Sequence, residues 1–305
     1  MSKLRGFFLF LSFCVSLFAS DVIYPFVAYS SYTSSFKTHD VLSGVYGSFS
    51  NADDTFYFGY EYKDTKASSD TNTSDTNTTN IADTNTTNNS SYNSKQHDFI
   101  VRYTKQLSTH VALDVAGHIS LSTLAQTDLN QIYLIGLSYT KKERFSFGVD
   151  LSYSLYNNYS LADDLYQVSP YFGLWYGDRF SRMGKVQMKL TYNYINPSNT
   201  NVALAATYNN FEIALKQVGE HFINIFAYSF GKNINIVKDK GFTVYMNNEI
   251  HNQGMILSSA LILSADAQLK LSYIMENFDE YDPYLSSMKQ DATMHRFVLS
   301  GFLRF

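Results

Sequence analysis

The chain has 305 residues, with 23 basic and 27 acidic side chains and a single cysteine. This slightly acidic balance offers no basic surface for nucleic acid, and one cysteine excludes a disulfide framework within the chain. The chain is rich in aromatic residues, with 25 tyrosines and 24 phenylalanines but only four prolines. Such a content suits both a membrane–water interface and a soluble β-sandwich, so the order of the elements has to decide between them.

The first 20 residues predict a cleaved export signal. Lys3 and Arg5 give a positive start, and the apolar stretch 7–18 that follows is too short to span a membrane. Ala19 and Ser20 supply small residues, and we expect cleavage after one of them. The expected mature chain then keeps 21 basic against 27 acidic residues, a formal charge of −6.

The single cysteine, Cys14, lies inside this predicted signal. A lipoprotein signal is the alternative for the same segment, but it needs a small residue before the cysteine, and Phe13 stands there. We therefore expect the mature chain, residues 21–305, to contain no thiol and no lipid anchor.

Beyond residue 20, apolar and polar side chains alternate almost to the end of the chain. Side chains on a strand point to opposite faces with period two, so this pattern predicts strands with one apolar face and one small, polar or charged face. No apolar run approaches the roughly 20 residues of a membrane helix, and strands in lipid must close into a barrel to pair their backbones. The clearest strands are 56–63, 98–104, 111–121, 145–154, 186–194 and 268–276.

The connections between these strands alternate in length. Short turns alternating with long loops are typical of outer-membrane barrels, with the turns on the periplasmic side. The predicted tight turns are 51–54, 141–144, 209–210 and 264–266, and the predicted longer loops are 64–96, 123–130, 156–163 and 279–291.

Counted from Val22, sixteen segments qualify as strands, with fourteen and twelve as alternatives. An even number places both ends of the barrel on the periplasmic side. The count of sixteen takes 202–208 and 211–218 as two strands joined at 209–210, and it takes 219–221 as an outer loop.

Residues 67–94 consist almost entirely of Ser, Thr, Asn and Asp, which predicts a disordered extracellular loop. Its Asp-Thr-Asn-Thr repeats resemble the extended acceptor of bacterial N-glycosylation, which makes Asn72, Asn77 and Asn85 candidate glycan acceptors. A repeat that only holds water is the alternative. A calcium loop would need a glycine turn and a bidentate glutamate, which are missing here.

The last strand carries Phe297, Leu299, Leu303 and the terminal Phe305 on one face, with Arg and Ser on the other. It resembles the closing strand of bacterial outer-membrane β-barrel proteins. The resemblance implies an all-β, transmembrane, antiparallel up-and-down barrel of 14–16 strands (12 as the lower bound) over residues 21–305. It also implies a Gram-negative outer-membrane location, with these four residues as the assembly signal. The implied partners are outer-membrane lipid, the barrel-assembly machinery, periplasmic chaperones and small solutes, with a homotrimer as the candidate assembly.

The polar face of the strands would line the lumen, and its charges are of both signs. Such a lumen is either a water-filled channel or a salt-bridged, filled interior. A porin-like channel for small hydrophilic solutes is the first hypothesis, and a non-conducting surface barrel for adhesion or for host or phage contact is the second. The acidic, aromatic stretch 278–283 could fold inward or form a rim. The predicted lumen residues are Glu61, Lys63, Asp98, Arg102, Asp114, His118, Asp150, Lys189, Glu212, Lys216, Lys270, Glu276, Arg296 and Arg304.

A lipid hydrolase is the third hypothesis. His118 and Ser120 resemble the His-x-Ser pair of outer-membrane phospholipase A, but they share the polar parity, whereas that family's pair faces lipid. His97 and Asp98 are an adjacent pair of the kind that outer-membrane proteases use, but nothing else of that family's pattern is present. The seven histidines show no metal-binding spacing and the glycines no phosphate loop. We therefore expect no enzyme, cofactor or metal.

Deleting 67–94 should leave membrane insertion intact, because the closure entropy of a long loop grows only as about 1.5 RT ln n. Removing Phe305 should impair assembly. Heat-modifiable migration on a denaturing gel reports both, and protease added to whole cells should cut within the loop. Loss of insertion on deletion, or protection from protease, would contradict the predicted topology.

Overall fold

The computed structural model describes ten stretches of the chain. The predicted signal peptide, most of the repeat loop and the three candidate glycan acceptors lie outside them. The described residues are 21–67, 93–124, 127–141, 144–156, 164–180, 184–198, 205–241, 243–244, 249–282 and 287–305.

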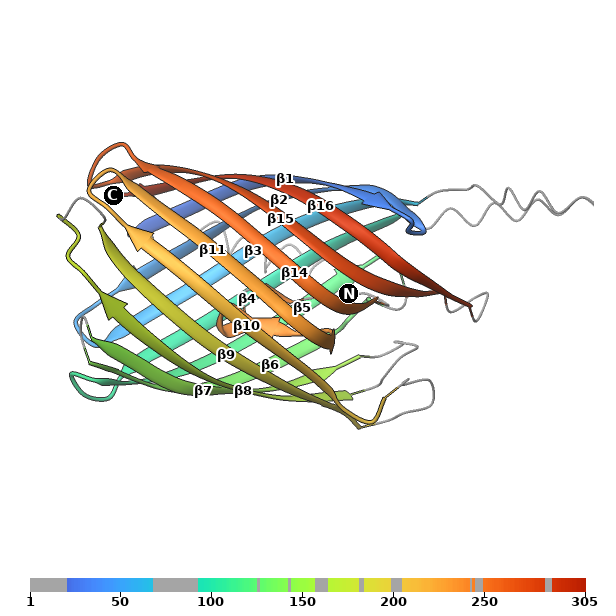
Figure 1. Ribbon diagram of the computed structural model, residues 1–305, viewed down its shortest axis with the longest axis horizontal. Coiled ribbons are helices and arrows are strands. Elements are labelled where there is room, and N and C mark those ends of the chain that lie inside the picture. Colours follow the sequence, from blue (N-terminus) through green and yellow to red (C-terminus); the bar gives the residue numbers. More distant parts are fainter. Residues whose placement is uncertain are drawn as a thin grey trace, which may run out of the picture.

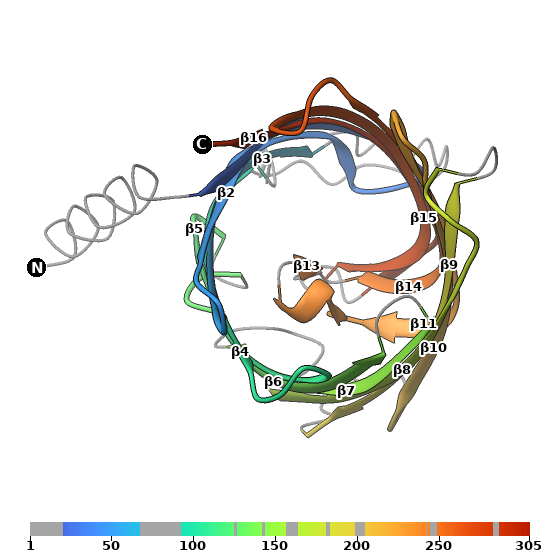
Figure 2. The ribbon, with the colours of Figure 1, turned by 90° about the vertical axis from the view of Figure 1, so that its left-hand side faces the viewer.

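Fourteen antiparallel strands form one closed barrel, in which β16 pairs with β1 (Figures 1 and 2). The predicted all-β closed barrel is therefore confirmed, with fourteen strands. They are β1 (Val22–Thr33), β2 (Lys37–Ser50), β3 (Asp54–Ala67), β4 (Ser94–Gln106), β5 (Val111–Ser122), β6 (Gln131–Lys141), β7 (Phe145–Leu155), β8 (Asp164–Tyr176), β9 (Lys185–Pro197), β10 (Tyr208–Val218), β11 (Phe222–Ile234), β14 (Glu249–Ile262), β15 (Ala267–Asp282) and β16 (Ser287–Arg304).

The two ends of the barrel differ. Asp21 and Phe305 meet at one end, where the Phe305 amide donates to the Asp21 carbonyl at 3.0 Å, and we call this the terminal end. The opposite end is called the loop end. In the part of the chain that the structure describes, no helix is long and apolar enough to cross a membrane. Within the described residues, the complete connections at the terminal end are 51–53, 107–110, 219–221 and 263–266.

The strand alternation sorts side chains between the two surfaces of the wall. Large apolar residues such as Leu137, Phe147 and Leu271 point outward and are 48–58 % exposed, while Asp114 and Ser120 point inward and are buried. An apolar exterior around a polar interior is the arrangement of a transmembrane barrel. The four residues of the predicted assembly signal also lie on the outward surface.

The predicted count of sixteen strands is wrong because 209–210 is not a turn. Strand β10 runs straight through it, and residues 205–207 before it are not in a strand. The Asn210 side chain is buried inside the barrel, where its amide donates to the carbonyls of Phe230 and Gly231 at 3.1 Å each. Asparagine pairs favour turns in general, but a polar interior satisfies them equally well.

The stretch 219–221 closes the hairpin between β10 and β11 at the terminal end, so its prediction as an outer loop is also wrong. Two of the predicted loops are shorter than expected, since β3 and β4 extend into 64–96 and β15 and β16 extend into 279–291.

Gly231 occupies a position in β11 where the backbone favours glycine. Its φ of +96° disfavours other residues, and an added Cβ would lie 2.4 Å from the Asn209 carbonyl oxygen. We expect Gly231→Ala to destabilise the barrel by about 1–3 kcal/mol and to lower the temperature at which the folded gel band disappears. Gly117→Ala is the matched control, because the nearest atom to its Cβ would be 3.7 Å away. Equal transition temperatures for the two variants would contradict this prediction.

Candidate functional site in the barrel interior

After β11 the chain bends into the barrel. Residues 235–244, which we call the inward segment, form β12 (Val237–Lys238), a 3-10 turn (Asp239–Gly241) and β13 (Thr243–Val244), and Figure 2 shows them inside the ring of strands. Asn235, Asp239 and Lys240 have φ values of +45°, +50° and +57°. Asn and Asp tolerate this left-handed region better than most residues, so the local sequence suits a sharp bend.

One glutamine on the wall holds the inward segment through its backbone. The Gln167 side chain on β8 donates to the Val237 carbonyl at 2.8 Å and accepts from the Val237 amide at 2.9 Å. It also donates to Ser169 at 2.7 Å. Gln167 is buried, and an unmade bond there would cost about 1–3 kcal/mol, so the pairing fixes β12 to this wall.

Two lysines attach the inward segment at separate points. Lys238 lies 2.7 Å from the Glu212 carboxylate on β10, and Lys240 forms a salt bridge with Asp114 on β5. Since β5 and β10 lie five strands apart in the barrel order, the segment bridges the interior. Burial by itself would lower the pKa of Lys238, but the charge and hydrogen bond of Glu212 outweigh it and raise that pKa above its usual value.

Apolar side chains fill the space between the inward segment and the wall. Ile234, Ile236 and Val237 are at most 4 % exposed and belong to one buried cluster. This packing makes the inward segment part of the folded core, and it occupies a share of the lumen. The wall residues of the cluster are Ala116, Ile132, Leu134, Tyr156, Leu165, Ile195, Tyr208 and Ile250.

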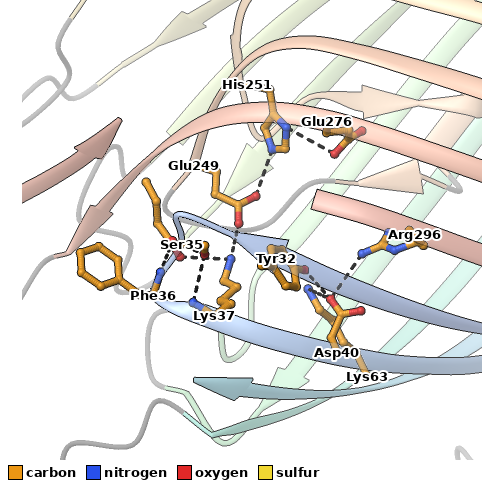
Figure 3. Close-up of polar contacts among 11 residues, drawn as sticks. Tyr32, Ser35, Phe36, Lys37, Asp40, Lys63, Glu249, His251, Glu276 and Arg296 are labelled. Carbon is orange, nitrogen blue, oxygen red and sulfur yellow. Dashed lines mark hydrogen bonds and ion pairs between the residues drawn. The ribbon is translucent and has the colours of Figure 1, made fainter. Parts of the chain in front are cut away.

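A polar network covers the wall formed by β1, β2, β14 and β15 at the loop end (Figure 3). Lys37 forms salt bridges with Glu249 and with Glu280, the latter at 3.5 Å. Glu280 accepts bonds from the Ser35 hydroxyl at 2.6 Å and the Phe36 amide at 2.9 Å. The network thereby ties the β1–β2 turn to β14 and β15.

The same network continues through a histidine. The two ring nitrogens of His251 lie 3.1 Å from a Glu249 oxygen and 3.4 Å from a Glu276 oxygen (Figure 3). All three side chains are buried.

Asp40 is the centre of a second group in Figure 3. Its carboxylate accepts from the Tyr32 hydroxyl at 2.6 Å and lies 3.4 Å from Arg296 and 3.8 Å from Lys63. Arg296 also donates to Ser30 at 2.7 Å. A fully buried carboxylate is costly without such partners, so these contacts explain why two cations gather on one wall.

The predicted lumen residues fall into four sets. Some meet an opposite charge: Lys63 and Arg296 at Asp40, Glu212 at Lys238, and Asp114 at Lys240. Two carboxylates lie beside histidine rings: Asp98 is 3.0 Å from His118, and Glu276 is 3.4 Å from His251. Others lie over aromatic rings: Arg102 over Tyr57, Lys189 over Tyr171 and Arg304 over Phe302. Glu61, Asp150, Lys216 and Lys270 form no salt bridge with any described residue.

The enzyme-like pairs do not form sites that face lipid. The His118 Nε2 pairs with Asp98 inside the barrel, and Ser120 is fully buried there. His97 and Asp98 point to opposite sides of β4, since His97 contacts the Tyr60 hydroxyl at 2.8 Å while Asp98 faces inward.

Several interior residues were not predicted from the sequence. The 14 residues between Ile234 and Glu249, with charges in their middle, were the available signal for the inward segment. Of the stretch 278–283, Phe278 and Glu280 are buried inward and belong to β15. The missed residues are Lys37, Asp40, Gln167, Lys238, Lys240, Glu249, His251 and Glu280.

The fold matches solved structures of bacterial outer-membrane barrels. The toluene transporter TodX of Pseudomonas putida gives a TM-score of 0.54 at 8 % identity, over 94 % of this chain and 91 % of that chain. A bacterial polysaccharide outer-membrane secretin gives 0.52 at 11 % identity over 94 % and 99 %. A FadL homologue of Pseudomonas aeruginosa gives 0.50 at 8 % identity over 94 % and 90 %.

At these identities the similarity shows a shared fold alone. The chain is therefore a closed antiparallel barrel of the outer-membrane type. No family model matches the sequence, and no curated protein matches it.

The Lys238–Glu212 pair should couple by about 1–2 kcal/mol in a double-mutant cycle of Lys238→Met and Glu212→Gln, because both side chains are mostly buried and in contact. Urea unfolding in detergent, followed by tryptophan fluorescence, measures the coupling. The folded pKa of Lys238 is raised, so this stability should be complete below about pH 10.4 and lost as the pH rises through the folded value. Lys238→Arg should retain the coupling. Strict additivity of the two substitutions at pH 8 would contradict the assignment.

Proposed function

We propose that this protein is an outer-membrane channel whose lumen is narrowed by the inward segment and that passes small hydrophilic solutes by diffusion. The observation that carries the proposal is the bridge from Gln167 and Glu212 on one wall to Asp114 on the other. Barrels of about eight strands fill their interior with side chains, and barrels of sixteen or more leave an aqueous channel. A wall of fourteen strands encloses more space than its own side chains fill, and a segment that crosses this space sets how wide a path remains.

The chemistry of the interior supports a wet lumen. Buried polar side chains point inward on each strand from β7 to β10, among them Ser152, Gln167, Asn193 and Asn210. The apolar exterior and the terminal strand support the outer membrane as the location and the barrel-assembly machinery as a partner. We propose no enzymatic role, because the His118 and Asp98 pair is buried inside the barrel, away from lipid.

A non-conducting surface barrel is the second candidate. The polar network around Lys37 and Asp40 together with the apolar cluster could block the loop end completely, and a blocked barrel would act as an anchor for its loops.

Recording from purified protein in planar lipid bilayers separates the two functions. We expect discrete conductance steps, and we expect a severalfold larger step when 236–247 is replaced by a short Gly-Ser linker, because the bridge across the lumen is then gone. The Lys95→Gln variant, altered at an exposed position, should conduct like the natural chain. If neither the natural chain nor the linker variant conducts at matched insertion, the non-conducting surface barrel is favoured. If the two conduct equally, the inward segment does not limit the flow of solutes.

A further inference from the structure

Besides the cations that lie over aromatic rings, the cations inside the barrel fall into two groups. Lys37, Lys63, Lys238, Lys240 and Arg296 each form a salt bridge with an inward carboxylate. Lys216 on β10 and Lys270 on β15 also point inward, but neither forms a salt bridge with any residue that the structure describes. Both lie toward the terminal end, since Lys216 is two residues before the end of β10 and Lys270 is three residues after the start of β15.

The wall between these two lysines is lined by small or apolar residues. Lys216 pairs in register with Ile225 of β11, and Lys270 pairs with Ala260 of β14. Lys216 lies in one register row with Ser272, through Ile225 of β11 and Ser258 of β14. Because neither lysine forms a salt bridge with any residue that the structure describes, this part of the inner wall carries positive charge.

A serine pair adds a hydrogen-bond donor beside Lys270. The Ser258 hydroxyl donates to the Ser272 oxygen at 2.8 Å, so the hydrogen of Ser272 points elsewhere. Ser272 lies two residues after Lys270 on the same face of β15 and is buried. An anion between two ammonium groups on one wall is attracted by both, and it can accept the hydroxyl hydrogen of Ser272.

We propose that Lys216, Lys270 and Ser272 form a binding site for a small anion that carries a carboxylate or phosphate group. The role of this site in solute selectivity rests on the channel function proposed above, and it makes anions the favoured solutes. Binding of an anion to the site does not require conduction.

The chain contains its own reporter for this site. Trp175 is the only tryptophan, and it points inward from β8. It pairs in register with Gln187 of β9, which pairs with Lys216 of β10. Two strand spacings place Trp175 roughly 10 Å from Lys216 along the wall. A soluble anion that gathers at the lysines therefore collides with this tryptophan more often.

Quenching of Trp175 fluorescence by iodide and by caesium in a neutral detergent, at constant ionic strength, tests the site. We expect the iodide quenching constant to fall by about twofold or more in Lys216→Gln/Lys270→Gln, with no fall for caesium, because the local anion concentration follows the local potential. Lys216→Arg/Lys270→Arg should keep the iodide constant of the natural chain, and Lys95→Gln should not change it. Inorganic phosphate should protect Trp175 from iodide in the natural chain and in the Arg variant, but not in the Gln variant.

Reversal potentials in a potassium chloride gradient give the matching measurement on the channel. A chloride preference that the Gln variant loses supports the site and its role in selectivity. If the bilayer stays silent but iodide quenching still depends on the two lysines, the anion site is supported and the channel function is contradicted. An iodide constant unchanged in a folded Gln variant, or no protection by phosphate in the natural chain, would overturn the site whatever the conductance.

Discussion

Every backbone donor and acceptor in a wall that meets lipid has to be paired within the wall, and this constraint organises the whole molecule. It explains why β16 closes onto β1 and why Phe305 and Asp21 still exchange a hydrogen bond beyond that pairing. It also explains why period-two alternation persists through nearly every strand. Once the wall is closed, its inner face is the place where polar chemistry can vary without disturbing the pairing.

The interior treats charge differently at its two ends. At the loop end, the buried carboxylates Asp40, Glu249 and Glu280 each meet a cation, and the pairs join strands that are not neighbours in the barrel order. Removing one partner from such a pair leaves an uncompensated charge, which is the costly case. Toward the terminal end, Lys185 and Lys189 of β9 lie over aromatic rings, and Lys216 and Lys270 form no salt bridge with any described residue. The charges of the loop end are therefore neutralised within the wall, whereas the proposed anion site depends on the charges toward the terminal end.

Much of the fold could be predicted from the sequence because lipid and water impose opposite demands on alternate residues. Leu299 and Leu271 identify the outward face, and Asp98 and Asp114 the inward one. The same reasoning could not decide whether 209–210 forms a turn or part of a strand, since an asparagine that faces the barrel interior and an asparagine in a turn are equally polar. The pairing of Asp98 with His118 depends on the register between β4 and β5, which a single sequence does not fix. The inward course of 235–244 was missed for a related reason, since a polar stretch between two strands has the same composition whether it leaves the barrel or enters it.

The position of the inward segment has a consequence for how such a protein can change over time. Strands β11 and β14 pair directly, so the inward segment is an insertion between two adjacent strands. The backbone pairing of these strands does not depend on it. Its length can therefore change without altering the strand register, whereas its lysines remain matched to carboxylates of the wall. A lineage that needs a different lumen width can alter this one connection together with those few wall partners and keep the strand pairing unchanged.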